Sequence, residues 1–201
     1  MRFPSRFALI APMAAVALAG CGINSIPTAE ENAKAKWADV QASYQRRADL
    51  IPNLQATVKG SAASEGKILT DVIEARAKAT SIQVTPETLN NPEAFDKFQK
   101  AQGELSGALS RLMVVSEQYP QLQANQAFRD LRVTLEGTEN RITVARNSYI
   151  KTVQEYNVLA RSFPTNITAK IFSYPPKANF SVQNESQISV PPTVDFGAPK
   201  K

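Results

Sequence analysis

A long run of apolar residues at helical spacing, with a proline in its middle, is the feature that most constrains how this chain can fold. Apolar side chains recur at intervals of three, four or their sums, the period of an amphipathic helix. The pattern keeps its phase through Pro52. Because proline lacks the backbone N–H that a helix interior uses, the chain must either kink there or reverse direction. The members of the run are Trp37, Val40, Tyr44, Ile51, Leu54, Val58, Ile68 and Val72.

Two later patterns predict further long helices. One runs from Pro92 to about Tyr119, with Asn91 as its N-cap and proline in the first helical position. The other runs from about Gln121 to Phe163. The apolar faces of both are heptad-like, as in coiled-coil packing.

The lengths of these segments favour a reversal at the proline. A single helix from Glu30 to Thr80 would be about 75 Å long, and the two later helices would leave much of its apolar face uncovered. A reversal near Asp49 to Ile51, with Asp49 as N-cap, gives rods of roughly 30, 45, 40 and 60 Å, which pack well together. We therefore expect an all-α, antiparallel up-and-down bundle of four long helices. The unbroken phase keeps a kinked continuous helix open as the alternative.

The ends of the bundle carry local signals. Thr28-Ala29-Glu30-Glu31 has capping-box spacing and predicts the first helix start. Thr165 is expected to cap one short turn that ends at Phe172. Beyond Ser173 the chain is punctuated by prolines and has no helical period, which predicts an extended tail with partial order from Phe180 to Val190.

The N-terminus has the composition of an export leader. Arg2 and Arg6 precede an apolar run, residues 7–18, that is short for a membrane span. Leu18-Ala19-Gly20-Cys21 resembles the lipobox of bacterial lipoproteins at every position. The resemblance implies cleavage before Cys21 and acylation, including palmitate, of its thiol and new amino terminus. An ordinary secretory leader with an incidental cysteine is the alternative.

On this interpretation the chain has four segments. Residues 1–20 are a signal peptide, 21–27 a lipidated linker, 28–172 the helical bundle and 173–201 the extended tail.

Composition excludes several kinds of chemistry. The chain has no histidine and one cysteine, which removes most metal sites, histidine-assisted nucleophiles and any intrachain disulfide. Its net charge of +5 falls to +3 once Arg2 and Arg6 leave with the leader, with 21 basic against 18 acidic residues. So small an excess gives no reason to expect nucleic acid as a partner. We expect no cofactor, no metal site and no catalytic residue.

The densest polar cluster surrounds the proline. We expect Asp49 and Asn53 to satisfy backbone groups that Pro52 frees, and Arg46 and Arg47 to pair with carboxylates on a neighbouring helix. A surface for a partner protein or an anionic lipid headgroup is the functional alternative.

A second cluster lies on the last long helix. Glu139 and Arg146 are seven residues apart on one helical face, which suits ion pairs between helices. Tyr149 and Tyr156 share that spacing and are expected to be seam residues with hydrogen-bonded hydroxyls. The candidate interaction surface therefore comprises Arg46, Arg47, Asp49, Asn53, Glu139 and Arg146.

Several motifs follow one another along the chain, among them Trp37-Ala38-Asp39-Val40, Arg46-Arg47-Ala48-Asp49-Leu50-Ile51-Pro52-Asn53-Leu54, Thr57-Val58-Lys59-Gly60, Thr138-Glu139-Asn140-Arg141-Ile142 and Phe163-Pro164-Thr165-Asn166. Together they resemble the LemA family over about Ala33 to Phe172. The resemblance implies an antiparallel helical bundle held to a bacterial membrane at its N-terminus, and it carries no established enzymatic activity. The chain departs from the commonest family pattern in having a lipobox in place of a transmembrane helix, and in its proline-punctuated tail.

These observations predict a lipid-anchored envelope protein that acts as a non-catalytic scaffold or interaction module. Its expected partners are the membrane, through lipid on Cys21, and an unidentified envelope protein. Gly22, where an aspartate would signal inner-membrane retention, favours the outer membrane facing the periplasm. The alternatives are a bundle that itself binds and remodels membranes, and an enzyme that uses only carboxylates and arginines.

Overall fold

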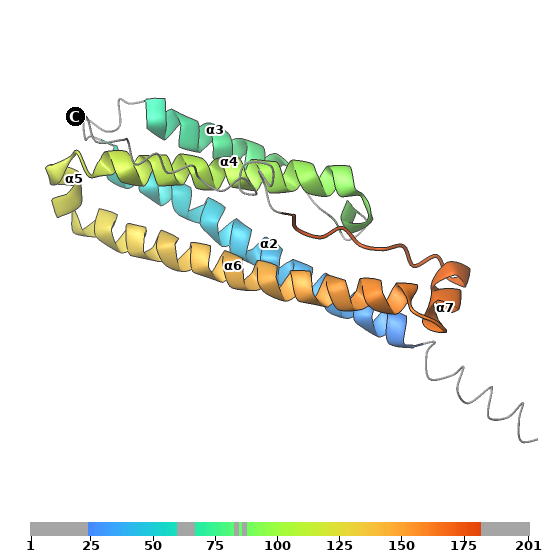
Figure 1. The fold of residues 1–201 in the computed structure, drawn as a ribbon. Helices are drawn as coiled ribbons and strands as arrows, with labels where there is room; N and C mark the ends of the chain where they lie inside the picture. The colour runs from blue at the N-terminus through green and yellow to red at the C-terminus, as the bar shows by residue number, and fades with distance from the viewer. Residues whose placement is uncertain (1–23, 60–66, 83–84, 86–87, 182–201) are drawn as a thin grey trace, which may run out of the picture.

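Four long helices lie side by side and run alternately up and down in the computed structural model, which describes residues 24–59, 67–82, 85 and 88–181 (Figure 1). Within these residues the secondary structure is entirely helical, so the predicted all-α antiparallel bundle is confirmed. The long helices are α2 (Ser25–Val58), α3 (Lys67–Ser81), α4 (Pro92–Ser116) and α6 (Gln126–Arg161), and the short ones are η2 (Thr88–Asn90), α5 (Pro120–Ala124) and α7 (Thr165–Ile171).

The first long helix does not turn at its proline. α2 continues through Pro52 to Val58, and α3 runs back from Lys67. The predicted reversal near Asp49 to Ile51, with Asp49 as N-cap, is therefore wrong. The unbroken spacing of apolar residues correctly indicated a helix that continues through Pro52. The predicted number of long helices, four, is correct, but the connection between the first two was placed too early in the chain.

A side chain from α3 compensates for the missing proline N–H. In a regular helix the N–H of residue 52 would donate to the carbonyl of Ala48. That carbonyl instead accepts a hydrogen bond from Arg76 Nε at 2.9 Å. The prediction that Asp49 and Asn53 would satisfy the freed backbone is wrong in this respect, because the donor comes from the neighbouring helix.

Asparagine caps define two helix starts. Asn91 accepts hydrogen bonds from the backbone N–H groups of Glu93 and Ala94, at 3.1 and 3.2 Å, so the predicted cap of α4 is confirmed. Asn125 caps α6 in the same way, and this cap was not predicted. The helix expected to begin at Gln121 is thus split into α5 and α6.

Two threonines predicted as caps lie inside helices. α2 begins three residues before Thr28, whose hydroxyl donates to the Asn24 carbonyl at 2.8 Å. Thr165 is the first residue of α7, and its hydroxyl donates to the carbonyls of Leu159 and Ser162. Both hydroxyls satisfy carbonyl groups, whereas a cap would accept from backbone N–H groups.

The broad end of the bundle is where all four long helices pack together. Its core is mostly aliphatic, because α3 and α4 cover the apolar faces of α2 and α6 there. The buried members are Ile51, Leu54, Val58, Leu69, Val72, Ala75, Ala79, Leu105, Ala108, Leu109, Leu112, Leu122, Phe128, Leu131 and Leu135.

At the narrow end, α2 and α6 extend beyond α3 and α4 (Figure 1), and the first turns of α4 contribute to an aromatic core beside them. Aromatic rings gather around Trp37, which lies 5.6 Å from Phe95, 5.3 Å from Phe98, 5.2 Å from Tyr149 and 6.3 Å from Phe180, measured between ring centroids. Phe180 belongs to the C-terminal tail, so the tail completes this part of the core.

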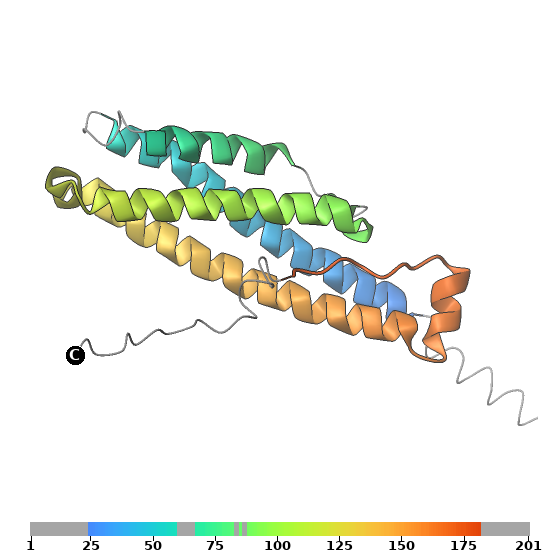
Figure 2. The same ribbon diagram turned by 45° about the horizontal axis from the view of Figure 1, so that its top comes forward.

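The described part of the tail is extended and runs back from α7 along the two long helices (Figure 2). Tyr149 donates to the Ala178 carbonyl at 3.0 Å and Tyr156 donates to the Pro175 carbonyl at 2.9 Å, which confirms the prediction of hydrogen-bonded seam tyrosines. Burial raises the pKa of both hydroxyls, that of Tyr156 to about 12. Most of the segment expected to be ordered, residues 182–190, lies outside the described residues.

Amide side chains hold the same segment through its backbone. Asn157 donates to the carbonyl of Lys177 at 3.0 Å and accepts from its N–H at 2.8 Å. Gln99 pairs with the backbone of Ser181 in the same two-bond manner. Lys177 itself is buried, with its ammonium 2.8 Å from a carboxylate oxygen of Glu30, so the tail is also tied to the first turns of α2.

Candidate functional site

Arg47, the interior member of the predicted cluster, lies where the two ends of the bundle meet. It projects from α2 and is completely buried. One terminal nitrogen, Nη1, donates to Glu139 Oε1 of α6 at 2.7 Å and to the hydroxyl of Ser106 on α4. The other, Nη2, donates to the backbone and side-chain oxygens of Gln102 at 3.1 and 2.6 Å. A single guanidinium therefore joins three helices.

The network reaches the fourth long helix through Gln102. Its amide nitrogen donates to the Ala79 carbonyl of α3 at 3.2 Å while its oxygen accepts from Arg47. Arg47 and Gln102 occupy positions on the buried faces of α2 and α4 where the pattern would otherwise place apolar residues. They therefore form a polar layer between the aliphatic core and the aromatic core. Such a layer fixes the relative register of the helices, since a shift would leave buried donors unpaired.

Tyr44 closes the layer on its aromatic side. The Arg47 guanidinium lies 5.1 Å from the centre of the Tyr44 ring, a cation–π arrangement. Burial raises the pKa of Tyr44, and the positive charges of Arg146 and Arg47 lower it by a smaller amount. The phenol therefore stays protonated at neutral pH and serves as an uncharged wall.

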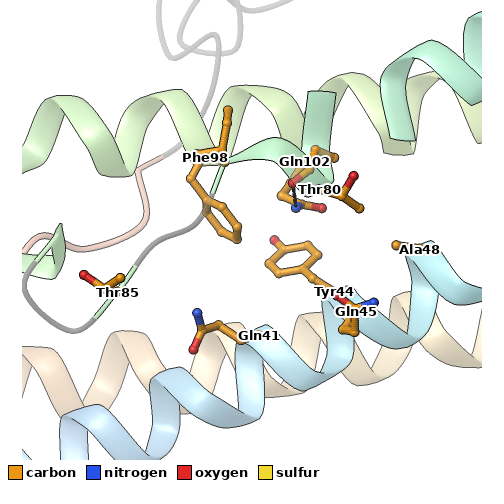
Figure 3. Close-up of a pocket in the computed structure, with 10 residues that line it drawn as sticks. Gln41, Tyr44, Gln45, Ala48, Thr80, Thr85, Phe98 and Gln102 are labelled. Carbon is orange, nitrogen blue, oxygen red and sulfur yellow. Dashed lines mark hydrogen bonds between the residues drawn. The ribbon is translucent and has the colours of Figure 1, made fainter. Parts of the chain in front are cut away.

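A hollow of about 370 Å³ lies between α2, α4 and the end of α3 (Figure 3). Figure 3 shows Tyr44 and Phe98 next to one another in its lining, and their rings are in edge-to-face contact with centroids 5.3 Å apart. The described lining carries amides, hydroxyls and apolar groups, and Tyr44 is its one ionisable side chain. The lining residues are Gln41, Tyr44, Gln45, Ala48, Ala79, Thr80, Ile82, Thr85, Phe98 and Gln102.

A second hollow, of about 390 Å³, opens on the other side of the polar layer. It brings together Arg47, Glu139 and Arg146 between α2, α4, α6 and the tail. Glu139 is the one carboxylate in its described lining, and it is already paired with Arg47. General acid–base catalysis by two carboxylates would need a second such group within reach, and Asp49 does not line this hollow.

The six predicted interaction residues fall into three environments. Arg47 and Glu139 form an ion pair between helices, as predicted, whereas exposed Arg46 forms no ion pair with a described carboxylate, so the pairing predicted for Arg46 is wrong. Arg146 lies over the Phe180 ring, 4.4 Å from its centre, so it contacts the tail. The others, Arg46, Asp49 and Asn53, are exposed on one face of α2, where Asp49 accepts from the Gln45 amide at 2.7 Å.

Several residues that build the site were not singled out from the sequence. Gln102 carried a usable signal, because it interrupts an apolar series that continues on both sides of it in the Pro92 pattern. Arg76 carried none, since only the packing of α3 on α2 brings it to Ala48. Cys21, the predicted lipidation site, lies outside the described residues, and none of the described helices is long and apolar enough to span a bilayer.

A family model described as the LemA family matches residues 36–196. The chain belongs to the LemA family. The match continues well past Phe172, so the tail is part of the LemA family region, and the interpretation of the tail as an addition to the family pattern is corrected. The antiparallel bundle implied by the resemblance is also observed.

Curated relatives of this LemA family member include magnetosome proteins. Magnetosome proteins MamQ 2 and MamQ 1 of Paramagnetospirillum magneticum (strain ATCC 700264 / AMB-1) are each 28% identical over 167 residues, which cover 75% of this chain and 61% of the relative. Magnetosome protein MamQ of Magnetospirillum gryphiswaldense (strain DSM 6361 / JCM 21280 / NBRC 15271 / MSR-1) is 27% identical over a stretch of the same extent. The chain thus matches less than two thirds of the length of these relatives.

Proposed function

We propose that this LemA family member is a lipid-anchored, non-catalytic scaffold of the bacterial envelope that presents a binding surface to a partner protein. The observation that carries the proposal is the use of the polar cluster inside the fold. Arg47 makes four hydrogen bonds that connect three helices. Its guanidinium and its partner carboxylate therefore stabilise the bundle and are not free to bind a substrate.

The lipid anchor is proposed at Cys21. α2 begins at Ser25, so only residues 22–24 separate the acylated cysteine from the bundle. Several acyl chains would hold the protein stably, since each buried methylene contributes about 0.8 kcal/mol. The outer membrane facing the periplasm is the proposed location, because Gly22 follows the cysteine.

Metabolic labelling with an alkynyl fatty acid tests the anchor. The parent protein should take up the label and fractionate with outer membranes on a density gradient, and Cys21→Ser should lose both properties. Labelling of Cys21→Ser, or its full retention with membranes, would show that the lipoprotein assignment is wrong. Recovery of the labelled parent protein in inner membranes would show that the proposed outer-membrane location is wrong, while the lipid anchor would stand.

The proposed partner surface is the exposed face of α2. Arg46, Asp49 and Asn53 are spaced three and four residues apart, which places them on one side of the helix and away from the core. Neither Arg46 nor Asp49 forms an ion pair with another described residue. Mixed charge and an amide on a rigid helix suit a polar protein surface better than an apolar one.

A photo-crosslinking amino acid at Arg46 tests this surface in living cells. The expected result is a discrete adduct with an envelope protein, and the matched control is the same amino acid at Lys100, which is exposed on α4. Equal crosslinking at both positions, or no adduct at Arg46 under several growth conditions, would count against the proposed partner surface.

A further inference from the structure

The narrow end of the bundle exposes four large apolar side chains close together in the chain. Phe163 is 81% exposed, Ile167 52%, Ile171 71% and Phe172 59%. Ile167 and Ile171 are one turn apart on α7 and share a face. These four residues are called the tip patch. Isolated exposed apolar residues are ordinary, but a group of this size usually marks a contact with a partner or a membrane.

The tip patch lies at the end of the molecule from which the N-terminal anchor leaves. Ala169 of α7 packs with Ile26 of α2 and with Tyr156 and Ala160 of α6. Figures 1 and 2 both show α7 beside the start of α2. Cys21 precedes the first described residue, Asn24, by three positions, which at about 3.5 Å per residue limits their separation to roughly 10 Å.

A basic hollow adjoins the tip patch. It has a volume of about 560 Å³, lies between the end of α6, α7 and the start of the tail, and is lined by Arg161, Lys170 and Asn166 among others. Residues 161–176 contain these two basic side chains and no acidic one. The buried side-chain oxygen of Asn166 has no hydrogen-bond partner among the described residues.

These groups match the headgroup of an anionic glycerol phospholipid. A phosphate in the hollow would accept hydrogen bonds from Arg161 and Lys170. The aromatic and aliphatic side chains of the tip patch suit the zone between headgroups and acyl chains. A protein partner would account for the apolar residues, but it would not by itself account for a basic hollow beside the anchored end.

We propose that the tip patch enters the surface of the membrane that holds the anchor, with an anionic phospholipid headgroup in the adjoining hollow. The inference rests on the proposed lipid anchor at Cys21, which keeps the patch at the bilayer surface. The bundle then stands on the membrane through two contacts, one covalent and one formed by the fold. Its long axis is thereby held at a defined angle to the bilayer.

Spin labels on the full lipidated protein test this contact. Cys21 is the one cysteine of the chain and is consumed by the lipid, so an introduced cysteine gives a single labelling site. Ile171→Cys is the test variant and Val133→Cys the matched control, because Val133 is 67% exposed on α6 near the broad end. Both proteins are reconstituted into vesicles of phosphatidylethanolamine and phosphatidylglycerol, and also into phosphatidylethanolamine and phosphatidylcholine.

The label at position 171 should become several-fold more accessible to oxygen than to a water-soluble nickel complex, and the label at position 133 should not. The difference should shrink at least twofold without phosphatidylglycerol, and also with it in a background of Arg161→Gln and Lys170→Gln.

Three results would overturn the inference in distinguishable ways. If the protein floats with vesicles but both labels stay in water, the anchor stands and the tip contact is wrong. If it does not float, the anchor and the contact fail together. If the label at position 171 is shielded from oxygen and nickel alike, the patch is covered by protein, and lipid is the wrong occupant.

Discussion

The two ends of the bundle share the helices α2 and α6 but are closed in different ways. At the broad end α3 and α4 cover them with aliphatic side chains. At the narrow end the first turns of α4 and the extended tail cover them, and the tail is held by particular side chains such as Tyr156 and Asn157. The difference follows from backbone chemistry: a helix satisfies its own N–H and carbonyl groups, whereas an extended segment needs donors and acceptors from elsewhere.

The comparison predicts different responses to damage. Loss of an aliphatic residue at the broad end weakens the bundle as a whole, because four helices share the core. Loss of a residue beneath the tail should in addition release the tail locally, because the extended tail depends on side chains of α2, α4 and α6 for its contacts.

The largest expected effect is that of Trp37→Ala. Both Trp37 and Leu105 are buried, at the narrow and broad ends respectively. Trp37→Ala should lower the free energy of unfolding by about 4 kcal/mol, and Leu105→Ala by about 3 kcal/mol. Urea denaturation measures both changes. Limited proteolysis under native conditions should cut the tail at least tenfold faster in Trp37→Ala only, and equal rates in the two variants would contradict the distinction between the ends.

Arg47→Ala tests the polar layer that joins the ends. It removes a buried guanidinium together with its ion pair to the half-exposed Glu139, and it leaves polar atoms of Gln102 and Ser106 without that donor, which should cost about 3 kcal/mol. Its exposed neighbour provides the control, because Arg46→Ala should change the free energy of unfolding by less than about 0.5 kcal/mol. Similar values for the two variants would show that the layer contributes nothing particular to stability.

A double-mutant cycle examines the proline at the broad end. Arg76→Ala should cost about 1.5 kcal/mol, because the Ala48 carbonyl loses its donor. In a Pro52→Ala background the new backbone N–H of residue 52 replaces that donor, so the same Arg76→Ala change should cost only a few tenths of a kcal/mol. Chemical denaturation of the four proteins measures the coupling, and strict additivity would rule out this account of how the helix tolerates proline.

The smallest effect expected at neutral pH is that of Tyr156→Phe at the narrow end. Loss of its hydrogen bond to the Pro175 carbonyl should cost about 1 kcal/mol.

Alkaline pH should reveal more of this contribution. Burial raises the pKa of Tyr156 to about 12 from an ordinary value of 10.0. Its ionisation therefore favours the unfolded chain, so the contribution is complete below pH 10 and declines as pH rises toward 12. Between pH 10 and 12 the free energy of unfolding should fall less steeply in Tyr156→Phe than in the parent protein. The two slopes should differ by up to about 1.4 kcal/mol per pH unit. Parallel curves for parent and variant would contradict a buried, neutral Tyr156.

The parts of the fold that follow from the helical spacing of apolar residues were predictable from the sequence. The helices containing Phe98 and Leu135 follow from apolar spacing, and the Asn91 cap follows from local chemistry. The connection between the first two helices was placed too early because the second helix was expected to be longer than α3 is. Gly60 and Gly66, which flank a stretch without large apolar residues, were a better signal than Pro52.

The parts that depend on tertiary pairing were not predictable. An ion pair on a neighbouring helix was expected for Arg47, but Glu139 is 92 residues away and could not be named as its partner. The same holds for Arg76 on the Ala48 carbonyl and for the amide of Asn157 on the tail. The sequence alone can show that a side chain requires a hydrogen-bond or ion-pair partner, but only the packing of the helices determines which residue that partner is.

The buried pair of Lys177 and Glu30 has a mechanical consequence. Glu30 lies near the start of α2, a helix of 34 residues and therefore roughly 50 Å long. A force that pulls on the N-terminus loads this helix along its axis and must shear it past α6 and the tail together. In shear, many contacts bear the load at once, so we expect the bundle to resist tension applied at its N-terminus.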